Sequence, residues 1–162
     1  MNDYLTYHVS NQVERPMPKA LIVYATRTKQ TLNIANLIAE GIRMKGLEVE
    51  VVNIGDFEKN GINPEGYDAI VLGSATYHGD MLQSMKTLLF ALEKPDLKGK
   101  VGGAFGAFGW SGEASTRIFD TMKHIYQLNM VSGPLRLKSA SLGGGTKMAQ
   151  DYGAEIAAKL AG

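Results

Sequence analysis

The sequence has 162 residues, of which 44% are hydrophobic and 20% charged, which fits a single ordinary globular domain. Its 17 Lys and Arg residues nearly balance its 16 Asp and Glu residues, so the charge favours neither nucleic-acid binding nor a polybasic membrane patch. The absence of cysteine excludes a disulfide, an iron–sulfur cluster and a thiol nucleophile, and three scattered histidines do not favour a metal site. With no long apolar run and no signal-peptide pattern at the start, a cytoplasmic protein without a membrane span is expected.

Residues 1–18 are predicted to form an extension ahead of the domain, because they are polar, contain two prolines and lack a sustained apolar period. We assign no chemistry to them. The alternative is an ordered arm in which Tyr4 and Tyr7 pack on a neighbouring surface or on a second subunit, which leaves a homodimer open. Residues 19–162 are then expected to form one domain.

Short apolar runs alternate with helical patterns along residues 19–162. Residues 20–24, 67–73 and 101–107 are continuous runs of apolar or small residues, as expected of strands buried on both faces of a parallel sheet. Residues 47–54 alternate like a strand near a sheet edge, and residues 131–138 are predicted to form a fifth strand. The helices between them are marked by apolar residues at helical spacing: Ala35, Ile38, Ala39, Ile42; Met85, Leu88, Leu89, Leu92; Ile118, Met122, Ile125; Ala149, Ile156, Ala157 and Leu160.

This alternation predicts an α/β fold, a doubly wound parallel sheet of five strands with helices on both faces. In such a fold, ligands bind outside the carboxyl ends of the strands, where the winding reverses. The loops after the first, third and fourth strands are therefore expected to meet at one edge of the sheet. These loops hold the candidate site residues.

The loop after the first strand carries three hydroxyls and two cations where a helix begins. Unpaired backbone N–H groups and the helix dipole favour an anion at such a position, and a phosphate group is the expected guest. The alternative is that Thr28 or Thr31 only caps the helix while the cations are solvated. The residues of this candidate phosphate loop are Thr26, Arg27, Thr28, Lys29, Gln30 and Thr31.

The other two loops each bring an aromatic side chain to the same edge. Two rings that approach from different loops can sandwich a flat heterocycle, so these loops predict a planar cofactor with a phosphate tail. Taken singly, each ring is more often a partly buried side chain that closes the end of the sheet. The candidate residues are Ala75, Thr76, Tyr77, His78 and Gly79 after the third strand, and Ala107, Phe108, Gly109, Trp110, Ser111 and Gly112 after the fourth.

Several other functions of α/β proteins lack the residues that they require. There is no glycine between Tyr24 and Glu40, so a G-x-G-x-x-G dinucleotide loop is absent, as is the Walker loop. The third strand ends in Gly73 and Ser74 rather than in the aspartate of a receiver domain, and no G-x-S-x-G nucleophile elbow occurs. Kinase and hydrolase functions are not supported.

The order of elements and the three loops resemble the flavodoxin family from about residue 19 to the end. Flavodoxins carry a Ser/Thr-x-Thr-Gly-x-Thr phosphate loop, and residues 26–31 match its three hydroxyl positions, with Lys29 in place of the glycine. The resemblance implies FMN as cofactor and the strand order 2-1-3-4-5. Lys29 is expected to add positive charge near the phosphate.

A closer resemblance is to the flavodoxin domain of flavodiiron proteins, also called A-type flavoproteins. Their Ser-Pro-Thr-Tyr-Asn-Gly and Tyr-Gly-Trp-Ser-Gly-Glu-Ala loops correspond to residues 74–79 and 108–114. This resemblance implies that residues 76–79 line one side of the isoalloxazine ring and residues 107–112 the other. His78 stands where many flavodoxins have glycine, and its Cβ makes backbone conformers with positive φ costlier.

The resemblance implies an electron-transfer protein with no catalytic side chain and no metal site, because nothing in this chain corresponds to the di-iron domain of flavodiiron proteins. FMN would carry electrons between redox partner proteins, and the near-neutral charge predicts a partner surface unlike that of the acidic flavodoxins. One alternative is a flavin enzyme, either a quinone reductase or the flavodoxin-type protoporphyrinogen oxidase. Another is a flavin-free interaction domain on the same fold.

Overall fold

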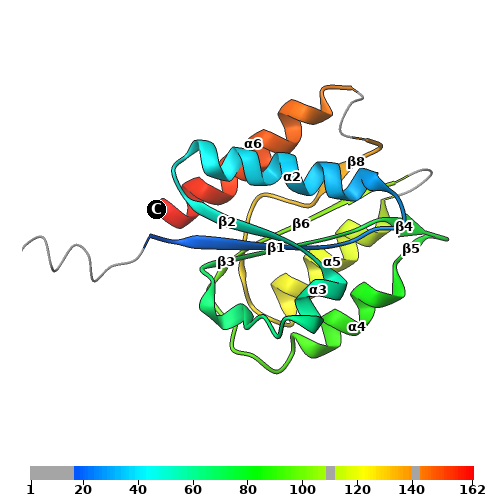
Figure 1. The fold of residues 1–162 in the computed structure, drawn as a ribbon, viewed down its shortest axis with the longest axis horizontal. Helices are drawn as coiled ribbons and strands as arrows, with labels where there is room; N and C mark the ends of the chain where they lie inside the picture. Colours follow the sequence, from blue (N-terminus) through cyan, green and yellow to red (C-terminus); the bar gives the residue numbers. More distant parts are fainter. Residues whose placement is uncertain (1–16, 109–111, 140–142) are drawn as a thin grey trace, which may run out of the picture.

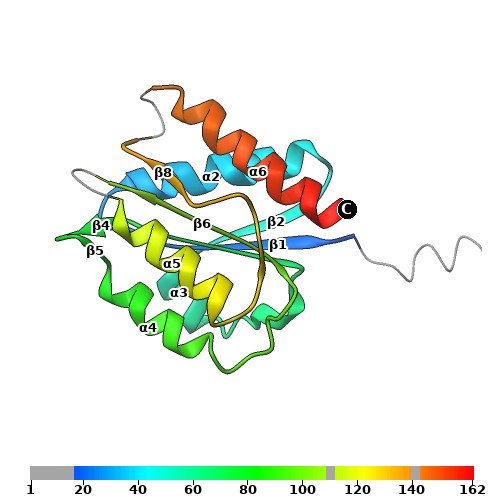
Figure 2. The same cartoon turned by 180° about the vertical axis from the view of Figure 1, so that it is seen from behind.

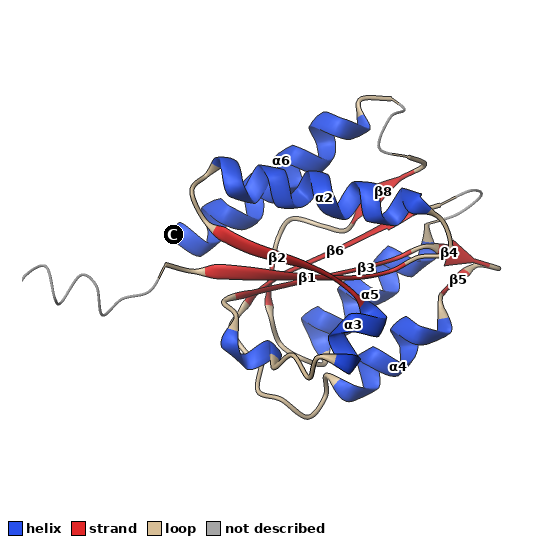
Figure 3. Cartoon of the chain, in the orientation of Figure 1, coloured by secondary structure: helices blue, strands red, loops and turns tan. Residues whose placement is uncertain are grey.

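The computed structural model describes residues 17–108, 112–139 and 143–162. A parallel sheet crosses the centre of the domain, with helices above and below it (Figures 1 and 3). Its strands lie in the order β2, β1, β3, β6, and both β7 and β8 pair with β6. Their bounds are β1 Lys19–Ala25, β2 Glu48–Asn53, β3 Ala69–Ser74, β6 Val101–Ala107, β7 Asn129–Met130 and β8 Leu135–Leu137. The predicted doubly wound α/β fold and strand order are confirmed.

The register of the sheet places the predicted apolar runs in its centre. Ile22 of β1 lies between Val51 of β2 and Val71 of β3, and Leu72 of β3 pairs with Ala104 of β6. All residues of β3 and β6 are buried, whereas β2 at the edge is partly exposed. The continuous apolar runs therefore form the inner strands, and the alternating run forms the edge strand β2, as predicted.

Helices cover both faces of the sheet, as the views from opposite sides show (Figures 1 and 2). Helix α2 (Lys29–Met44) and helix α6 (Gly145–Ala161) pack on one face with the even-numbered β1 residues Ala20 and Ile22. The other face holds α3 (Ile54–Lys59), α4 (Gln83–Ala91) and α5 (Glu113–His124), with the 3-10 helix η1 (Pro64–Gly66) in the connection before β3. Two buried clusters, one on each side of the sheet, make up the core.

Helices α2 and α6 lie unusually close to each other because two glycines face the opposite backbone. A Cβ added to Gly153 would lie 2.1 Å from the carbonyl oxygen of Ile38, and one added to Gly41 would lie 2.0 Å from that of Gln150. No side chain fits in either place. This close contact fixes α2, and with it the loop that precedes it, against the sheet.

The fifth strand differs from the prediction that residues 131–138 form one strand. β7 and β8 are separate short strands, and the chain between them leaves the sheet. Pro134 has no N–H to donate to β6. Helix α6 binds three polar groups of this interruption: Glu155 accepts hydrogen bonds from the N–H and hydroxyl of Ser132, and the Gly133 carbonyl accepts one from the Tyr152 hydroxyl at 2.7 Å.

A second difference lies after β3, where the sequence predicted only a polar loop. Residues 76–81 form a hairpin of two very short strands, β4 (Thr76–Tyr77) and β5 (Asp80–Met81), in which Thr76 pairs with Met81 and Tyr77 with Asp80. We call this segment the 76–81 hairpin. It projects from the carboxyl end of the sheet, at the edge where the sequence placed the site (Figure 1).

Candidate functional site

The phosphate loop predicted between β1 and α2 is a turn held together by its own hydroxyls. The Thr26 hydroxyl oxygen accepts a hydrogen bond from the Thr28 N–H at 3.1 Å, and the hydroxyl donates to the Thr28 carbonyl. Thr28 is the N-cap of α2, and its hydroxyl oxygen accepts from the Gln30 N–H at 3.3 Å. Thr28 therefore caps the helix, and the other N–H groups of this first turn can still bind an anion.

Thr31 differs from the other hydroxyl residues of this loop because its side chain is completely buried. It has 0% exposure, and its Oγ1 has no hydrogen-bond partner among the residues that the structure describes. Leaving a buried hydroxyl unpaired costs about 1–3 kcal/mol. This unpaired hydroxyl lies in the first turn of α2, the turn where the sequence predicts the phosphate group.

The 76–81 hairpin turns through two residues with positive φ. His78 has φ of 51° and Gly79 has φ of 76°, the signs that a two-residue type I′ turn requires at both positions. Any Cβ raises the energy of a backbone conformation with positive φ, and His78 nevertheless adopts this conformation. Histidine is among the residues most often found with positive φ, and the cost is offset by the pairing of β4 with β5.

Tyr77 carries its ring on the outer part of this hairpin, where 48% of the residue is exposed. The Arg27 guanidinium carbon lies 4.2 Å from the centre of the Tyr77 ring, within the range of a cation–π contact. The His78 ring meets the Tyr77 ring edge-on at 4.1 Å between centroids. The first and second candidate loops therefore touch through Arg27 and Tyr77.

A cavity of about 540 Å³ opens between these loops at the carboxyl edge of the sheet. Its size lies in the range of about 300–1,000 Å³ that is common for small-molecule sites. The cavity brings together these predicted site residues: Arg27, Thr28, Gln30, Ala75, Thr76, Tyr77, Ala107 and Phe108. All three predicted loops thus contribute to one concave surface.

Other predicted site residues are not among the described residues that line this cavity. These are Thr26, Lys29, Thr31, His78, Gly79 and Gly112, of which Lys29 is exposed at the start of α2. Gly109, Trp110 and Ser111 lie outside the described residues. The ring that was predicted to face Tyr77 from the third loop therefore stays a prediction.

One residue that lines the cavity was not predicted from the sequence. Lys138 directly follows β8 and is exposed. The rule that placed the loops after the other strands at the carboxyl edge also applies to the end of the fifth strand, and it would have found this residue. With Arg27, Lys138 gives the described lining two cations and no acidic side chain, which suits an anionic ligand.

A polar network at the base of the hairpin explains why the loop after β3 has a defined shape. The Ser74 hydroxyl donates to the Ala75 carbonyl at 2.9 Å, and its oxygen accepts from the Leu82 N–H at 3.1 Å. The Thr76 hydroxyl oxygen accepts from the Ala114 N–H of α5 at 3.3 Å. These bonds fasten both ends of the hairpin, so Tyr77 projects from an anchored base.

Valine at position 78 should destabilise the protein, because a β-branched residue at positive φ is strained by about 1–2 kcal/mol. We expect His78→Val to lower the free energy of unfolding in urea and to weaken binding of the FMN that the sequence resemblance implies, measured by fluorescence titration. Gln127, with φ of 58°, supplies a matched control just before β7, at the amino end of the sheet. Gln127→Val should cost similar stability and leave flavin binding unchanged; equal flavin affinity in both variants would contradict a role of the hairpin turn.

These features define an α/β protein with a cofactor-sized, cationic and aromatic cavity at the point where the winding of the sheet reverses. The sequence profile of the flavodoxin domain family matches residues 21–134, more than half of the chain. The chain belongs to this family. Flavodoxin domains bind FMN and transfer electrons, which confirms the cofactor and the function class expected from the sequence.

Individual relatives agree with this assignment. The type A flavoprotein fprA of Rhodobacter capsulatus is 31% identical over 147 residues, which is 88% of this chain and 33% of the relative. Among solved structures, an archaeal flavodoxin superposes with a TM-score of 0.81 at 28% identity, over 89% of this chain and 99% of the flavodoxin. The rubredoxin oxygen:oxidoreductase of Desulfovibrio gigas superposes with a TM-score of 0.82 at 25% identity, over 98% of this chain and 41% of that protein.

The chain spans about a third to two fifths of the length of the first curated relatives that it matches. It is therefore similar to one part of those proteins. Within the described residues, no group of three or more His, Cys, Asp or Glu side chains is placed to hold a metal ion. No helix in the described ranges is long and apolar enough to cross a membrane.

Proposed function

We propose that this chain holds FMN in the cavity between β1, β3 and β6 and passes electrons between redox partner proteins. The observation that carries the proposal is the convergence of the hydroxyl turn, the cations and the Tyr77 ring on one cavity of suitable size. Bound FMN would supply the redox chemistry, because it can accept and release one or two electrons. The protein side chains need only bind and orient it.

The residues divide into a phosphate end and a ring end. The first turn of α2, with Thr28, Thr31 and the cation Arg27, would hold the phosphate group. Tyr77 on the hairpin and Trp110 in the following loop would enclose the ring, while backbone groups of residues 107–112 would contact its polar edge. Lys29, exposed beside the same turn, would add positive charge.

The electron-carrier function is preferred to that of a flavin enzyme because of the loop after β6. Helix α5 begins at Glu113, directly after Gly112, so only residues 108–112 separate it from β6. The flavodoxin-type protoporphyrinogen oxidase, one of the alternatives considered from the sequence, would have a long insertion here. Rapid oxidation of NAD(P)H with a quinone acceptor and no partner protein would favour the enzyme instead.

The proposed arrangement has residues 19–162 as the flavin-binding domain and residues 1–18 as an extension. The partners are proposed to be electron-transfer proteins. The near-neutral net charge of +1 supports a docking surface unlike that of strongly acidic flavodoxins. We also propose a cytoplasmic location, as expected from the sequence.

Removing the buried hydroxyl of Thr31 tests the phosphate end of this proposal. Thr31→Val keeps the shape of the side chain, and we expect the dissociation constant of FMN to rise about tenfold because one hydrogen bond to a charged group is lost, which costs about 1.5 kcal/mol at the lower end of the range for such bonds. Quenching of flavin fluorescence measures this affinity. The matched control is Thr87→Val on α4, whose hydroxyl donates only to the Gln83 carbonyl of its own helix.

Thr31→Val binding FMN as tightly as the unchanged protein would place the phosphate elsewhere. Failure of the unchanged protein to quench flavin fluorescence would instead contradict FMN binding and favour the flavin-free interaction domain. A variant that loses affinity together with Thr87→Val would point to a general loss of structure. The three results are distinguishable in one set of titrations.

A further inference from the structure

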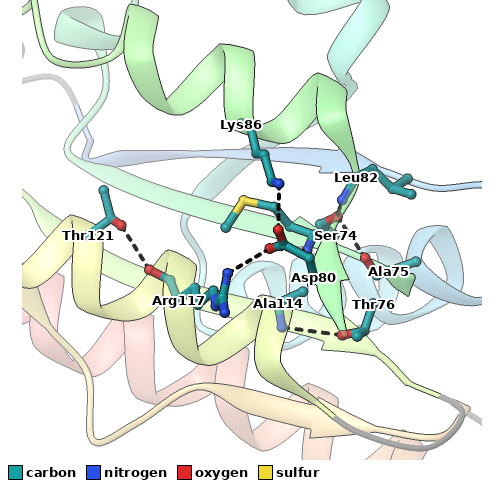
Figure 4. A network of polar contacts seen from close by, with 10 residues as sticks. Ser74, Ala75, Thr76, Asp80, Leu82, Lys86, Ala114, Arg117 and Thr121 are labelled. Atoms are coloured by element: carbon teal, nitrogen blue, oxygen red, sulfur yellow. Dashed lines mark hydrogen bonds and ion pairs between the residues drawn. The ribbon is translucent and has the colours of Figure 1, made fainter. Parts of the chain in front are cut away.

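Asp80 is the residue in which three elements around the hairpin meet. It lies on β5, opposite Tyr77 of β4, and its side chain is 25% exposed. One carboxylate oxygen, Oδ2, lies 2.5 Å from Lys86 Nζ of α4, and the other, Oδ1, lies 3.2 Å from a guanidinium nitrogen of Arg117 on α5. Figure 4 shows Asp80 between these two cations.

The same carboxylate also holds the backbone of its own strand. Asp80 Oδ1 accepts a hydrogen bond from the Met81 N–H at 2.8 Å. The hydrogen bond from Lys86 is the main cause that lowers the pKa of Asp80, and the Met81 amide and Arg117 add to it, while partial burial acts against them. Asp80 is therefore charged at neutral pH, and both oxygens are engaged.

We propose that Asp80 is a positioning residue of the flavin site, which ties the 76–81 hairpin to α4 and α5 and so fixes where Tyr77 meets the flavin. This inference rests on the proposed function. Asp80 is not among the described residues that line the cavity, so it acts on the flavin through the hairpin. The other anchors, Ser74 and Thr76, hold the ends of the segment near the sheet, whereas Asp80 holds its outward strand.

The contacts of Asp80 differ from those of an ordinary surface ion pair. An exposed single pair contributes little, as expected for Lys147 and Asp151, which lie 2.9 Å apart on α6 with side chains 79% and 64% exposed. Asp80 joins two cations from different helices and a backbone amide, and these groups restrain one another as a network. A two-stranded hairpin this short is not stable without such outside contacts.

The decisive comparison is between variants that remove opposite charges. Asp80→Asn removes a negative charge and Arg117→Gln a positive one, so a purely electrostatic effect on the FMN phosphate would change the affinity in opposite directions. Positioning predicts the same direction for both, because each variant releases the same hairpin. We expect about a tenfold rise in the FMN dissociation constant for Asp80→Asn and a smaller rise for Arg117→Gln.

Two further readouts do not depend on affinity. In the FMN-free chain, hydrogen exchange of the backbone amides of residues 76–82 should become faster in both variants. In the FMN-bound chain, the midpoint potential of the flavin should shift in Asp80→Asn. If Asp80 had a merely structural role, its replacement would lower the melting temperature and leave the potential of the bound flavin unchanged. Asp80→Glu should recover part of the affinity, and Asp151→Asn on α6 is the matched control.

Each outcome of these experiments either supports or overturns the proposed role of Asp80. Faster exchange of the hairpin amides together with weaker FMN binding in both charge variants supports the role of Asp80. Equal affinity, potential and exchange in Asp80→Asn and Asp151→Asn would overturn it, as would opposite changes of affinity in Asp80→Asn and Arg117→Gln. Failure of the unchanged chain to bind FMN would overturn the proposed function itself. Titrating the unchanged chain with FMN shows this without any variant.

Discussion

Gly153→Ala is expected to lower the free energy of unfolding by about 3 kcal/mol or more, because the new methyl group would collide with the backbone of α2. It would lie 2.1 Å from the Ile38 carbonyl oxygen and 3.0 Å from the Ile42 nitrogen of α2, so the two helices must move apart. Ile38 and Ile42 are fully buried, and that movement would open the core on this face of the sheet. Urea unfolding followed by circular dichroism measures the loss.

Gly66→Ala is the control for this substitution. Gly66 has no atom within 4 Å of the position that a Cβ would take, so a change of no more than about 0.5 kcal/mol is expected. Because α2 carries the phosphate turn at its N-terminus, Gly153→Ala should also weaken FMN binding. A variant as stable as Gly66→Ala would show that α2 and α6 do not approach as closely as described.

Tyr77→Ala should produce the largest loss of flavin affinity among substitutions that leave the fold intact. The Tyr77 residue is 48% exposed, so its removal takes little from the core. An aromatic ring stacked on a flat heterocycle contributes about 1–3 kcal/mol, so the FMN dissociation constant should rise about 10- to 100-fold. Fluorescence titration measures the affinity, and thermal unfolding of the FMN-free protein checks that stability is kept.

Phe90→Ala serves as the matched control for Tyr77→Ala. Phe90 is an aromatic residue on α4 with 74% exposure, and it does not belong to the described lining of the cavity. Its removal should leave FMN affinity unchanged. If Tyr77→Ala also binds FMN with unchanged affinity, the ring does not lie against this hairpin and the proposed ring site is wrong.

The sequence predicted the features of the fold that depend on long patterns. Continuous apolar runs gave β1 and β3, helical spacing gave α2, and the turn residues between them marked the carboxyl edge. The family resemblance supplied FMN and the order of the strands. The apolar patterns and the family resemblance are each spread over many residues, so a single substitution such as Lys29 for glycine does not remove them.

Short elements and long-range contacts could not be predicted in this way. β4 and β5 have two residues each, too few to show alternation, and the break between β7 and β8 depends on how Tyr152 and Glu155 satisfy a backbone that leaves the sheet. The network of Asp80 joins residues 6 and 37 positions apart in the chain, whose proximity follows only from the packing of α4 and α5. No local pattern encodes these contacts.

The most direct test of the account is to titrate the isotope-labelled protein with FMN and follow its backbone amide signals. We predict saturable binding, with shifts concentrated in the three predicted loops, residues 26–31, 75–80 and 107–112, and at Lys138, which lines the cavity at the carboxyl edge of the sheet. Residues 98–100 and 127–129, at the opposite edge, should not shift. Signals that stay unchanged, or shifts centred on that opposite edge, would contradict the proposed flavin site.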